Sequence, residues 1–281
     1  ITGDEDGLQL RGGYPSGGGT QDPETNVTVL SGDLDGDDTD SDSDGIIEDT
    51  NPDDDDTVEN LNGSNAYHVL VLDGGGVGFG SDVGANVTSS TVIDGVTVTA
   101  GNAAPGAADT REGGGLYCDG GGSGNACSPT ITDVTFAGNN AARGGAINTA
   151  GYSSGASAPT ITDAVFTGNS AINPLDISEG GALFNDAGSP EIIGAVFRNN
   201  TVKGDGGAVF DSEFDSESIP TIVNTVFVGN SAVNGGNGGA AVIGGATTIT
   251  NVTFTENSAS GGSGGAIQTG VNPTIGNSIL W

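Results

Sequence analysis

The sequence predicts an all-β fold in which the chain coils as a parallel β-solenoid of about seven to eight rungs. Three observations support this prediction: one phrase recurs every 26–31 residues, each copy holds short alternating apolar runs, and 53 of the 281 residues are glycine. A fixed period of this length is typical of a solenoid, because each repeat can bury its apolar face only against its neighbours. The whole chain, residues 1–281, is therefore expected to form a single domain.

The repeated phrase first appears as PTITDVTFAGNNAARGGAI from Pro129. Copies begin at Pro159, Pro190, Pro220 and Thr247, and another opens at Pro273. Each of the five full copies carries Phe, then Asn three residues later, then Gly-Gly-Ala. Rungs that stack about 4.8 Å apart place equal positions above one another, so we expect a Phe ladder inside and an Asn ladder at a corner. The ladder residues are Phe136, Phe166, Phe197, Phe227, Phe254, Asn139, Asn169, Asn200, Asn230 and Asn257.

A second corner is expected between the first two apolar runs of each copy. The residue at this position tolerates a left-handed backbone in all six copies. The Gly-Gly pair supplies small residues where the backbone turns or where neighbouring rungs press together. The corner residues are Asp133, Asp163, Gly194, Asn224, Asn251 and Asn277.

The pattern continues toward the N-terminus with less regularity. Residues 90–117 form another rung with Val98 in the Phe place, whereas residues 66–76, 26–33 and 7–14 read as strands of two or three more. This division predicts first rungs over 1–32, an Asp-rich insertion between rungs over 33–62, irregular rungs over 63–128 and regular repeats over 129–281.

The combination of F-x-x-N with G-G-A-[ILV] resembles the polymorphic outer-membrane-protein repeat of secreted and surface proteins. The phrases VTVLSGDLDG, NAYHVL and VIDGVTVTAGN are similar to the opening rungs of large bacterial cell-surface proteins of that type. The resemblance covers roughly residues 26–281. It implies a right-handed parallel β-helix, export, and adhesive or structural roles without shared catalytic residues.

The charge balance excludes several partners. Thirty-seven acidic residues face five Lys and Arg, which leaves no basic face for nucleic acid or for anionic lipid. No apolar run is long enough for a transmembrane helix, so this segment is not expected to insert in a membrane. The sequence has no initiator Met and no signal peptide, which predicts a processed or trimmed part of a longer precursor.

The acidic stretch DLDGDDTDSDSDGIIEDTNPDDDD predicts structural Ca²⁺ sites. Asp40, Asp42, Asp44 and the following Gly45 have the spacing of a calcium loop, in which alternate side chains converge on one ion. Asp33, Asp35 and Asp37 form a second alternating set, without that final Gly. The alternative is a disordered, solvated acidic loop.

Cys118 and Cys127 lie in the glycine-rich stretch CDGGGSGNAC, with no His or third Cys nearby that would indicate zinc. We expect a disulfide between them, worth about 2–3 kcal/mol, and hence a location outside the cytoplasm. Two buried free thiols are the alternative.

Enzymatic function is not expected. A lyase needs a poised basic residue, whereas Arg143, Arg198 and Lys203 read as solvent-facing charge. A hydrolase needs two carboxylates, but the corner role accounts for Asp133 and Asp163. The sequence therefore predicts a non-catalytic extracellular or cell-surface structural protein, calcium-stabilised and self-associating. The alternatives are an adhesin or carbohydrate-binding β-helix that contacts surface glycans, and a polysaccharide lyase or hydrolase. The aromatic residues that could stack on a glycan are scattered in the sequence: Tyr14, Tyr67, Tyr117 and Tyr152.

The last prediction concerns assembly. The sequence stops inside a rung, at PTIGNSILW, and starts close to the strand-like GLQLRGGY. An uncovered apolar layer beside an open strand ladder invites pairing with another copy, so we expect head-to-tail stacking into filaments. A separate anchor domain that covers Trp281 is the alternative.

Overall fold

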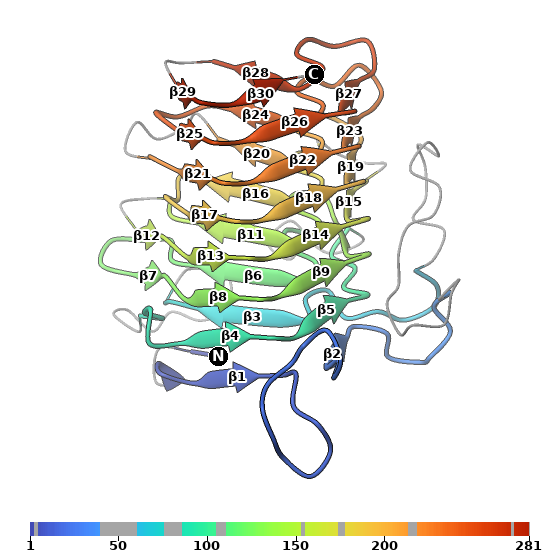
Figure 1. Ribbon diagram of the computed structural model, residues 1–281, viewed down its shortest axis with the longest axis vertical. Helices are drawn as coiled ribbons and strands as arrows, with labels where there is room; N and C mark the ends of the chain where they lie inside the picture. The colour runs from blue at the N-terminus through green and yellow to red at the C-terminus, as the bar shows by residue number, and fades with distance from the viewer. Residues whose placement is uncertain are drawn as a thin grey trace.

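The computed structural model describes residues 1–2, 5–39, 61–75, 86–104, 111–152, 155–173, 178–212, 218–270 and 273–280. Over these ranges the chain is all-β and winds as a parallel β-helix, with the strands of successive rungs stacked along the long axis (Figure 1). No helix among the described residues is long and apolar enough to cross a membrane.

Four sheets form the walls of the β-helix, and every strand pair within them is parallel. Sheet 1 contains β1 (Gln9–Arg11), β4 (Val92–Asp94), β8 (Thr130–Thr132), β13 (Thr160–Thr162), β17 (Glu191–Ile193), β21 (Thr221–Val223), β25 (Thr248–Thr250) and β29 (Thr274–Gly276). Sheet 2 contains β2 (Val29–Ser31), β5 (Thr97–Thr99), β9 (Thr135–Ala137), β14 (Val165–Thr167), β18 (Val196–Arg198), β22 (Val226–Val228), β26 (Thr253–Thr255) and β30 (Ile279–Leu280).

Sheets 3 and 4 complete each turn. Sheet 3 contains β10 (Asn140–Ala141), β15 (Ser170–Ala171), β19 (Thr201–Val202), β23 (Ser231–Ala232) and β27 (Ser258–Ala259). Sheet 4 contains β3 (Leu70–Asp73), β6 (Leu116–Asp119), β11 (Ile147–Ala150), β16 (Leu183–Asp186), β20 (Val209–Asp211), β24 (Ala241–Ile243) and β28 (Ile267–Thr269). A small extra pair joins β7 (Ala126–Cys127) to β12 (Ala156–Ser157).

The interior is built from equal positions of successive rungs, as the repeat predicts. The five ladder Phe residues are fully buried and their rings stack in parallel, with centroids 4.4 Å apart between Phe166 and Phe197. Val98 pairs with Phe136 and continues this row toward the N-terminus. Facing it, the central residues of sheet 1 and the first residues of sheet 4 fill the core with Ile and Leu. The core is therefore one continuous column.

The first four residues of the Asn ladder are fully buried, Asn257 is partly buried, and hydrogen bonds join all five. Asn200 donates through Nδ2 to Asn230 Oδ1 (2.9 Å) and to the backbone oxygen of Phe166 (3.0 Å). Its own Oδ1 accepts from Nδ2 (3.0 Å) and from the backbone N–H (3.1 Å) of Asn169. The same contacts recur from Asn139 to Asn257. The side chain therefore satisfies backbone groups that the corner withdraws from water.

The predicted left-handed corners are confirmed. All six corner residues between sheets 1 and 2 have positive φ, from 51° at Asp133 to 69° at Gly194. A second left-handed residue precedes each ladder Asn, and the first Gly of each Gly-Gly pair is the third, as at Gly206 (φ 76°). The second Gly of each pair is required for a different reason, the close approach of the next rung. A β-carbon on Gly207, for example, would overlap the backbone oxygen of Gly239.

The N-terminal strands differ from the prediction of two or three separate rungs. β1, β2 and β3 each pair with a strand of the next rung, β4, β5 and β6, so they form a single rung. The acidic insertion therefore leaves from within a rung, between β2 and β3, and not between rungs. Strands of three or four residues carry too little pattern to show which of them share a turn.

Candidate metal centre

The acidic insertion leaves and returns through a short neck. Asp33 forms an antiparallel bridge with Asn65, and the N–H of Leu34 donates to the backbone oxygen of Ser64 (3.0 Å). The N–H of Ala66 donates to the backbone oxygen of Gly32 (2.8 Å). Residues 32–39 and 61–66 therefore lie side by side, and Figure 1 shows this segment projecting beside the β2 end of the β-helix.

Asp33, Asp35 and Asp37 gather in this neck. Each offers one carboxylate oxygen, and these oxygens lie within 4.8 Å of one another. Asp33 also shapes the loop, because its Oδ1 accepts from the N–H groups of Asp35 (3.2 Å) and Gly36 (2.7 Å). Gly36 turns with φ 74°, so a glycine does lie within this set, although not at the expected last position.

The returning strand places Gly63 against the carboxylates. A β-carbon at Gly63 would lie 2.6 Å from both carboxylate oxygens of Asp37 and 2.7 Å from Asp35 Oδ2. The N–H of Ser64 donates to Asp35 at 3.2 Å. Removal from water, a carboxyl–carboxyl hydrogen bond with Asp35 and repulsion from Asp35 and Asp33 all raise the pKa of Asp37. A shared proton or a cation between these carboxyl groups would relieve their repulsion.

Two further residues of the neck, Asn62 and Asn65, escaped the sequence analysis, and both contact Asp38 of the acidic stretch. Asp38 accepts from the N–H of Asn62 (2.6 Å) and from the side chain of Asn65 (2.5 Å). Burial raises the pKa of Asp38, these two hydrogen bonds lower it, and repulsion from Asp33 and Asp37 raises it further. The two Asn residues follow a long acidic run in sequence, so no spacing indicates that they return to Asp38.

The donor set fits a hard divalent cation. Three carboxylates can supply up to six oxygen ligands, and Ca²⁺ takes roughly 6–8 oxygens in flexible geometry. No Lys, Arg or His lies among the described residues of the neck, 32–39 and 61–66, to neutralise the charge. The other predicted ligands, Asp40, Asp42 and Asp44, lie outside the described residues.

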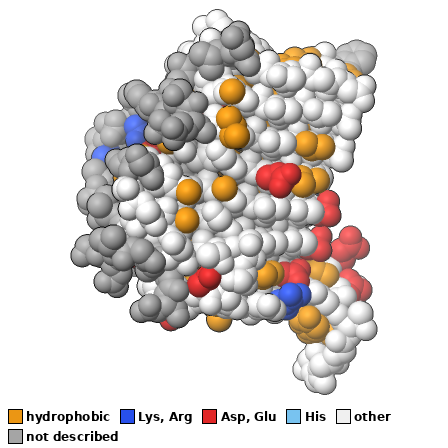
Figure 2. Space-filling model, turned by 90° about the vertical axis from the view of Figure 1, so that its left-hand side faces the viewer, with side chains coloured by type: hydrophobic (Ala, Val, Ile, Leu, Met, Phe, Trp, Pro, Cys, Tyr) orange, Lys and Arg blue, Asp and Glu red, His pale blue; other side chains and the backbone are white. Residues whose placement is uncertain are grey.

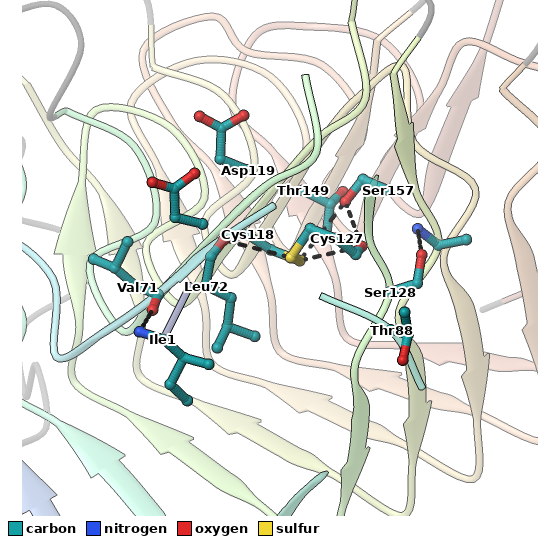
Figure 3. The surroundings of a disulfide bond; sticks show 12 residues. Ile1, Val71, Leu72, Thr88, Cys118, Asp119, Cys127, Ser128, Thr149 and Ser157 are labelled. Carbon is teal, nitrogen blue, oxygen red and sulfur yellow. Dashed lines mark hydrogen bonds between the residues drawn. A yellow bond between two sulfur atoms is a disulfide. The ribbon is translucent and has the colours of Figure 1, made fainter. Parts of the chain in front are cut away.

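The two cysteines form a disulfide in the structure, with Cα atoms 5.7 Å apart (Figure 3). Both residues are fully buried, and Cys118 points into the core beside Leu72. Ser157 of the next rung donates to the backbone oxygen of Cys127 (3.1 Å). The bridge therefore fastens the loop after β6 against the wall of the β-helix.

Arg143, expected to be a solvent-facing charge, is only partly exposed and lies between two acids. Its guanidinium contacts Glu112 (3.2 Å) in one neighbouring rung and Glu179 (2.9 Å) in the other, and lies over the ring of Phe184. Burial raises the pKa of both Glu residues, and Arg143 opposes that rise. Arg198 donates to Thr167 Oγ1 at 3.0 Å. These side chains tie rungs together.

The tyrosines do not form a stacking platform over the described surface. Tyr14 and Tyr67 are about half exposed, whereas Tyr117 is buried on the outer side of sheet 4 against His68. The carbohydrate-binding alternative therefore lacks the row of exposed rings that binds sugars in many proteins.

One repeat of this chain is similar to a known protein family. Residues 251–270 match the Chlamydia polymorphic membrane protein repeat. The matched stretch contains Phe254, Asn257 and Gly264-Gly265-Ala266, and the same signature lies at equal positions in the four preceding rungs. This match and the parallel β-helix fit a repeat protein of the polymorphic membrane protein type, which is the resemblance expected from the sequence. Neither the curated proteins nor the solved structures contain a significant match to the chain.

Proposed function

We propose that this β-helix is a non-catalytic structural protein of the cell surface, in which Ca²⁺ orders the acidic insertion. The observation that carries the proposal is the uninterrupted stacking of polymorphic-membrane-protein-type rungs, in which the repeated residues serve the core and the corners. The buried disulfide supports a location outside the cytoplasm. Antibody labelling of intact cells tests that location; labelling that requires permeabilised cells would contradict it.

Calcium binding at Asp33, Asp35 and Asp37 is expected to order the insertion. Titration with CaCl₂ should give saturable heat at neutral pH, and chelator should increase proteolytic cleavage within residues 33–62. Asp37→Asn should affect cleavage of the calcium-bound and the chelated protein in opposite directions, because the change removes both a charge repulsion and a calcium ligand. It should slow cleavage of the chelated protein and abolish the further protection by CaCl₂.

The matched control is Glu191→Gln, which removes an exposed acid on β17 far from the neck. It should leave the calcium effect unchanged.

The neck should also respond to pH. The pKa of Asp37 is raised in the folded state, so the folded protein holds this proton more tightly than the unfolded chain. In the presence of chelator, the neck should therefore become more protected from cleavage as pH falls from 7 toward the ordinary Asp pKa of 3.8. Calcium protection should weaken over the same range. Equal cleavage with calcium and with chelator in wild type would refute the site.

We also propose that the protein associates end to end. Ile275 on β29 and Ile279 and Leu280 on β30 are 42–54% exposed, and these strands are the last in sheets 1 and 2. A further rung would cover this layer, and a second copy can supply it through β1 and β2 at the other end of the sheets. Electron microscopy with CaCl₂ should show filaments, which Ile279→Asp shortens. Discrete monomers at high concentration would overturn this proposal.

A further inference from the structure

The corner between sheets 2 and 3 departs from the repeat in one rung. In the five regular rungs, the left-handed residue before the ladder Asn is Gly138, Gly168, Asn199, Gly229 and Glu256. Glycine adopts this backbone at the least cost. The N–H of Asn199 donates to the backbone oxygen of Val228 in the next rung (3.1 Å), so backbone contacts hold the corner. The fold therefore tolerates the side chain of Asn199 but does not require it.

A second departure lies two residues later, at the start of the sheet 3 strand. This position is Asn140, Ser170, Thr201, Ser231 and Ser258 in the same five rungs. Ser170 donates to Asn140 Oδ1 (3.1 Å), and Ser231 and Ser258 share a hydrogen bond (3.1 Å). The hydroxyl of Thr201 is buried and has no hydrogen-bond partner among the described residues. A buried polar group without a partner costs stability, so this hydroxyl indicates a role outside the fold.

Asn199 and Thr201 together form a sequon, Asn-x-Thr, which is the acceptor sequence for N-linked glycosylation of exported proteins. The other four regular rungs carry no sequon at this corner. Four further sequons begin elsewhere in the chain, at Asn26, Asn62, Asn86 and Asn251. The two departures from the repeat therefore coincide in the one rung where they create an acceptor site.

The side chain of Asn199 is accessible at the corner. It is exposed, and its amide nitrogen has no hydrogen-bond partner in the described part of the chain. Its Oδ1 lies over Gly229 in the next rung, where a β-carbon would be only 2.6 Å away. Gly229 thus makes room for this carboxamide. The amide nitrogen is the atom that would carry a glycan, and the described fold does not use it.

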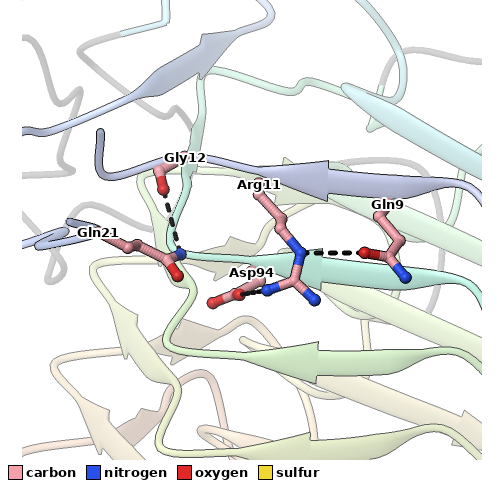
Figure 4. Close-up of polar contacts among 5 residues, drawn as sticks. All are labelled: Gln9, Arg11, Gly12, Gln21 and Asp94. Carbon is pink, nitrogen blue, oxygen red and sulfur yellow. Dashed lines mark hydrogen bonds and ion pairs between the residues drawn. The ribbon is translucent and has the colours of Figure 1, made fainter. Parts of the chain in front are cut away.

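The sequon at Asn26 lies in the loop between β1 and β2. This loop is fastened by Gln21, which donates to the backbone oxygen of Gly12 (3.1 Å), as Figure 4 shows. Asn26 is partly buried and donates through Nδ2 to the backbone oxygen of Asp22 (3.2 Å). A glycan on Asn26 would therefore compete with a contact of the folded protein.

The three remaining sequons are also less suitable. Asn62 donates through Nδ2 to the backbone oxygen of Asp37 (3.3 Å), and Asn251 donates to Asn224 (3.1 Å). Asn86 is partly buried. Exposure and an unused amide nitrogen therefore distinguish Asn199 from the other acceptor sites.

The surface beside Asn199 is poor in charge. On the face in Figure 2, acidic side chains gather near one edge, and the strands of sheet 2 contain no acidic residue. The outer positions of these strands instead include four partly exposed valines, Val165, Val196, Val226 and Val228. Asn199 comes directly after β18, beside these valines. Because a glycan is bulky and solubilising, one attached here would hydrate an apolar part of the wall.

We propose that Asn199 carries an N-linked glycan. Its Nδ2 forms a bond to the anomeric carbon of a lipid-linked glycosyl phosphate, the bond from that carbon to the phosphate oxygen breaks, and Nδ2 loses one proton as the lipid phosphate leaves. Thr201 is only 2% exposed in the folded rung, so the modifying enzyme reads the sequon before this rung stacks, during export of the unfolded chain. The modification rests on the cell-surface location proposed above.

The test is mass spectrometry of peptides from the whole protein, purified from the surface fraction of its native cells. The peptide that contains Asn199 should carry the mass of attached sugars. Thr201→Val should abolish this mass although Asn199 is retained, whereas Thr201→Ser, which keeps the hydroxyl, should preserve it. In protein made by a host without N-glycosylation, Thr201→Val should not lower the melting temperature, because valine replaces an unpartnered hydroxyl with a methyl group.

Two further variants serve as controls. Asn199→Gly restores the common residue of the repeat and should remove the sugar while the fold is kept, whereas Asn26→Gln should leave the attached mass unchanged. Unmodified Asn199 in surface protein would overturn this proposal alone, and so would sugar that survives Thr201→Val or that is lost only in Asn26→Gln. A chain retained in the cytoplasm would contradict the surface location and this modification together.

Discussion

Phe197→Ala is expected to lower the free energy of unfolding by about 3–5 kcal/mol, the range for a fully buried Phe. Its ring lies between those of Phe166 and Phe227, with centroids 4.4 and 4.7 Å away, so its removal opens a void in the middle of the column. The neighbouring rungs are held by their own strand ladders and cannot close over that void. Urea denaturation followed by circular dichroism measures the loss.

The control for this change is Phe210→Ala. Phe210 occupies the outward-facing position of β20, is partly exposed, and stacks on Phe184 with ring centroids 5.8 Å apart. Phe210→Ala removes the same side-chain atoms but leaves the interior filled, so it should lower the free energy of unfolding by at most half as much. Equal destabilisation by the two changes would contradict the assignment of the Phe ladder as the principal core.

Gly207→Ala is expected to destabilise the protein by about 3 kcal/mol, at the upper end of the cost of overpacking. The added β-carbon would overlap the backbone oxygen of Gly239 and lie 2.8 Å from the backbone nitrogen of Ser231. Both atoms belong to the next rung, where the N–H of Ser231 donates to Asn200 and the N–H of Gly239 donates to Gly264. The rungs must therefore separate locally to admit one methyl group. Thermal unfolding of the purified variant measures the effect.

The same repeat position supplies the control. Gly265 is the second Gly of its pair, but a β-carbon there would meet nothing closer than 3.8 Å. Gly265→Ala should be neutral or stabilising by about 0.4–1 kcal/mol, because alanine restricts the unfolded chain. If both substitutions destabilised the protein equally, the cause would be the backbone conformation of the Gly-Gly pair and not the approach of the next rung.

The regular rungs could be predicted from the sequence because each structural need recurs at a fixed spacing. Phe136 and its four copies had to face one interior, and the corner residues from Asp133 to Asn277 share a tolerance that few residues have. The repeat matched to known proteins carries the same features. Periodicity thus converts a weak local signal into a strong one.

Features that occur once could not be predicted in this way. Asp38 meets Asn62 and Asn65 across an insertion of more than twenty residues, and three-residue strands do not reveal that β1, β2 and β3 share a rung. Arg143 looked solvent-facing because the sequence does not show that Glu112 and Glu179 flank it in adjacent rungs.

The Asn ladder gives the whole molecule a direction. From Asn139 to Asn230, every side-chain amide donates to the ladder Asn of the next rung toward the C-terminus, and each of the next four ladder oxygens accepts from the rung before it. The side-chain dipoles consequently point the same way and add along the long axis instead of cancelling. Hydrogen bonds in such a chain polarise one another, so each added rung strengthens the bonds already present. A longer array of these repeats would therefore be more rigid per rung than a shorter one, and its two ends would differ in electrostatic sign.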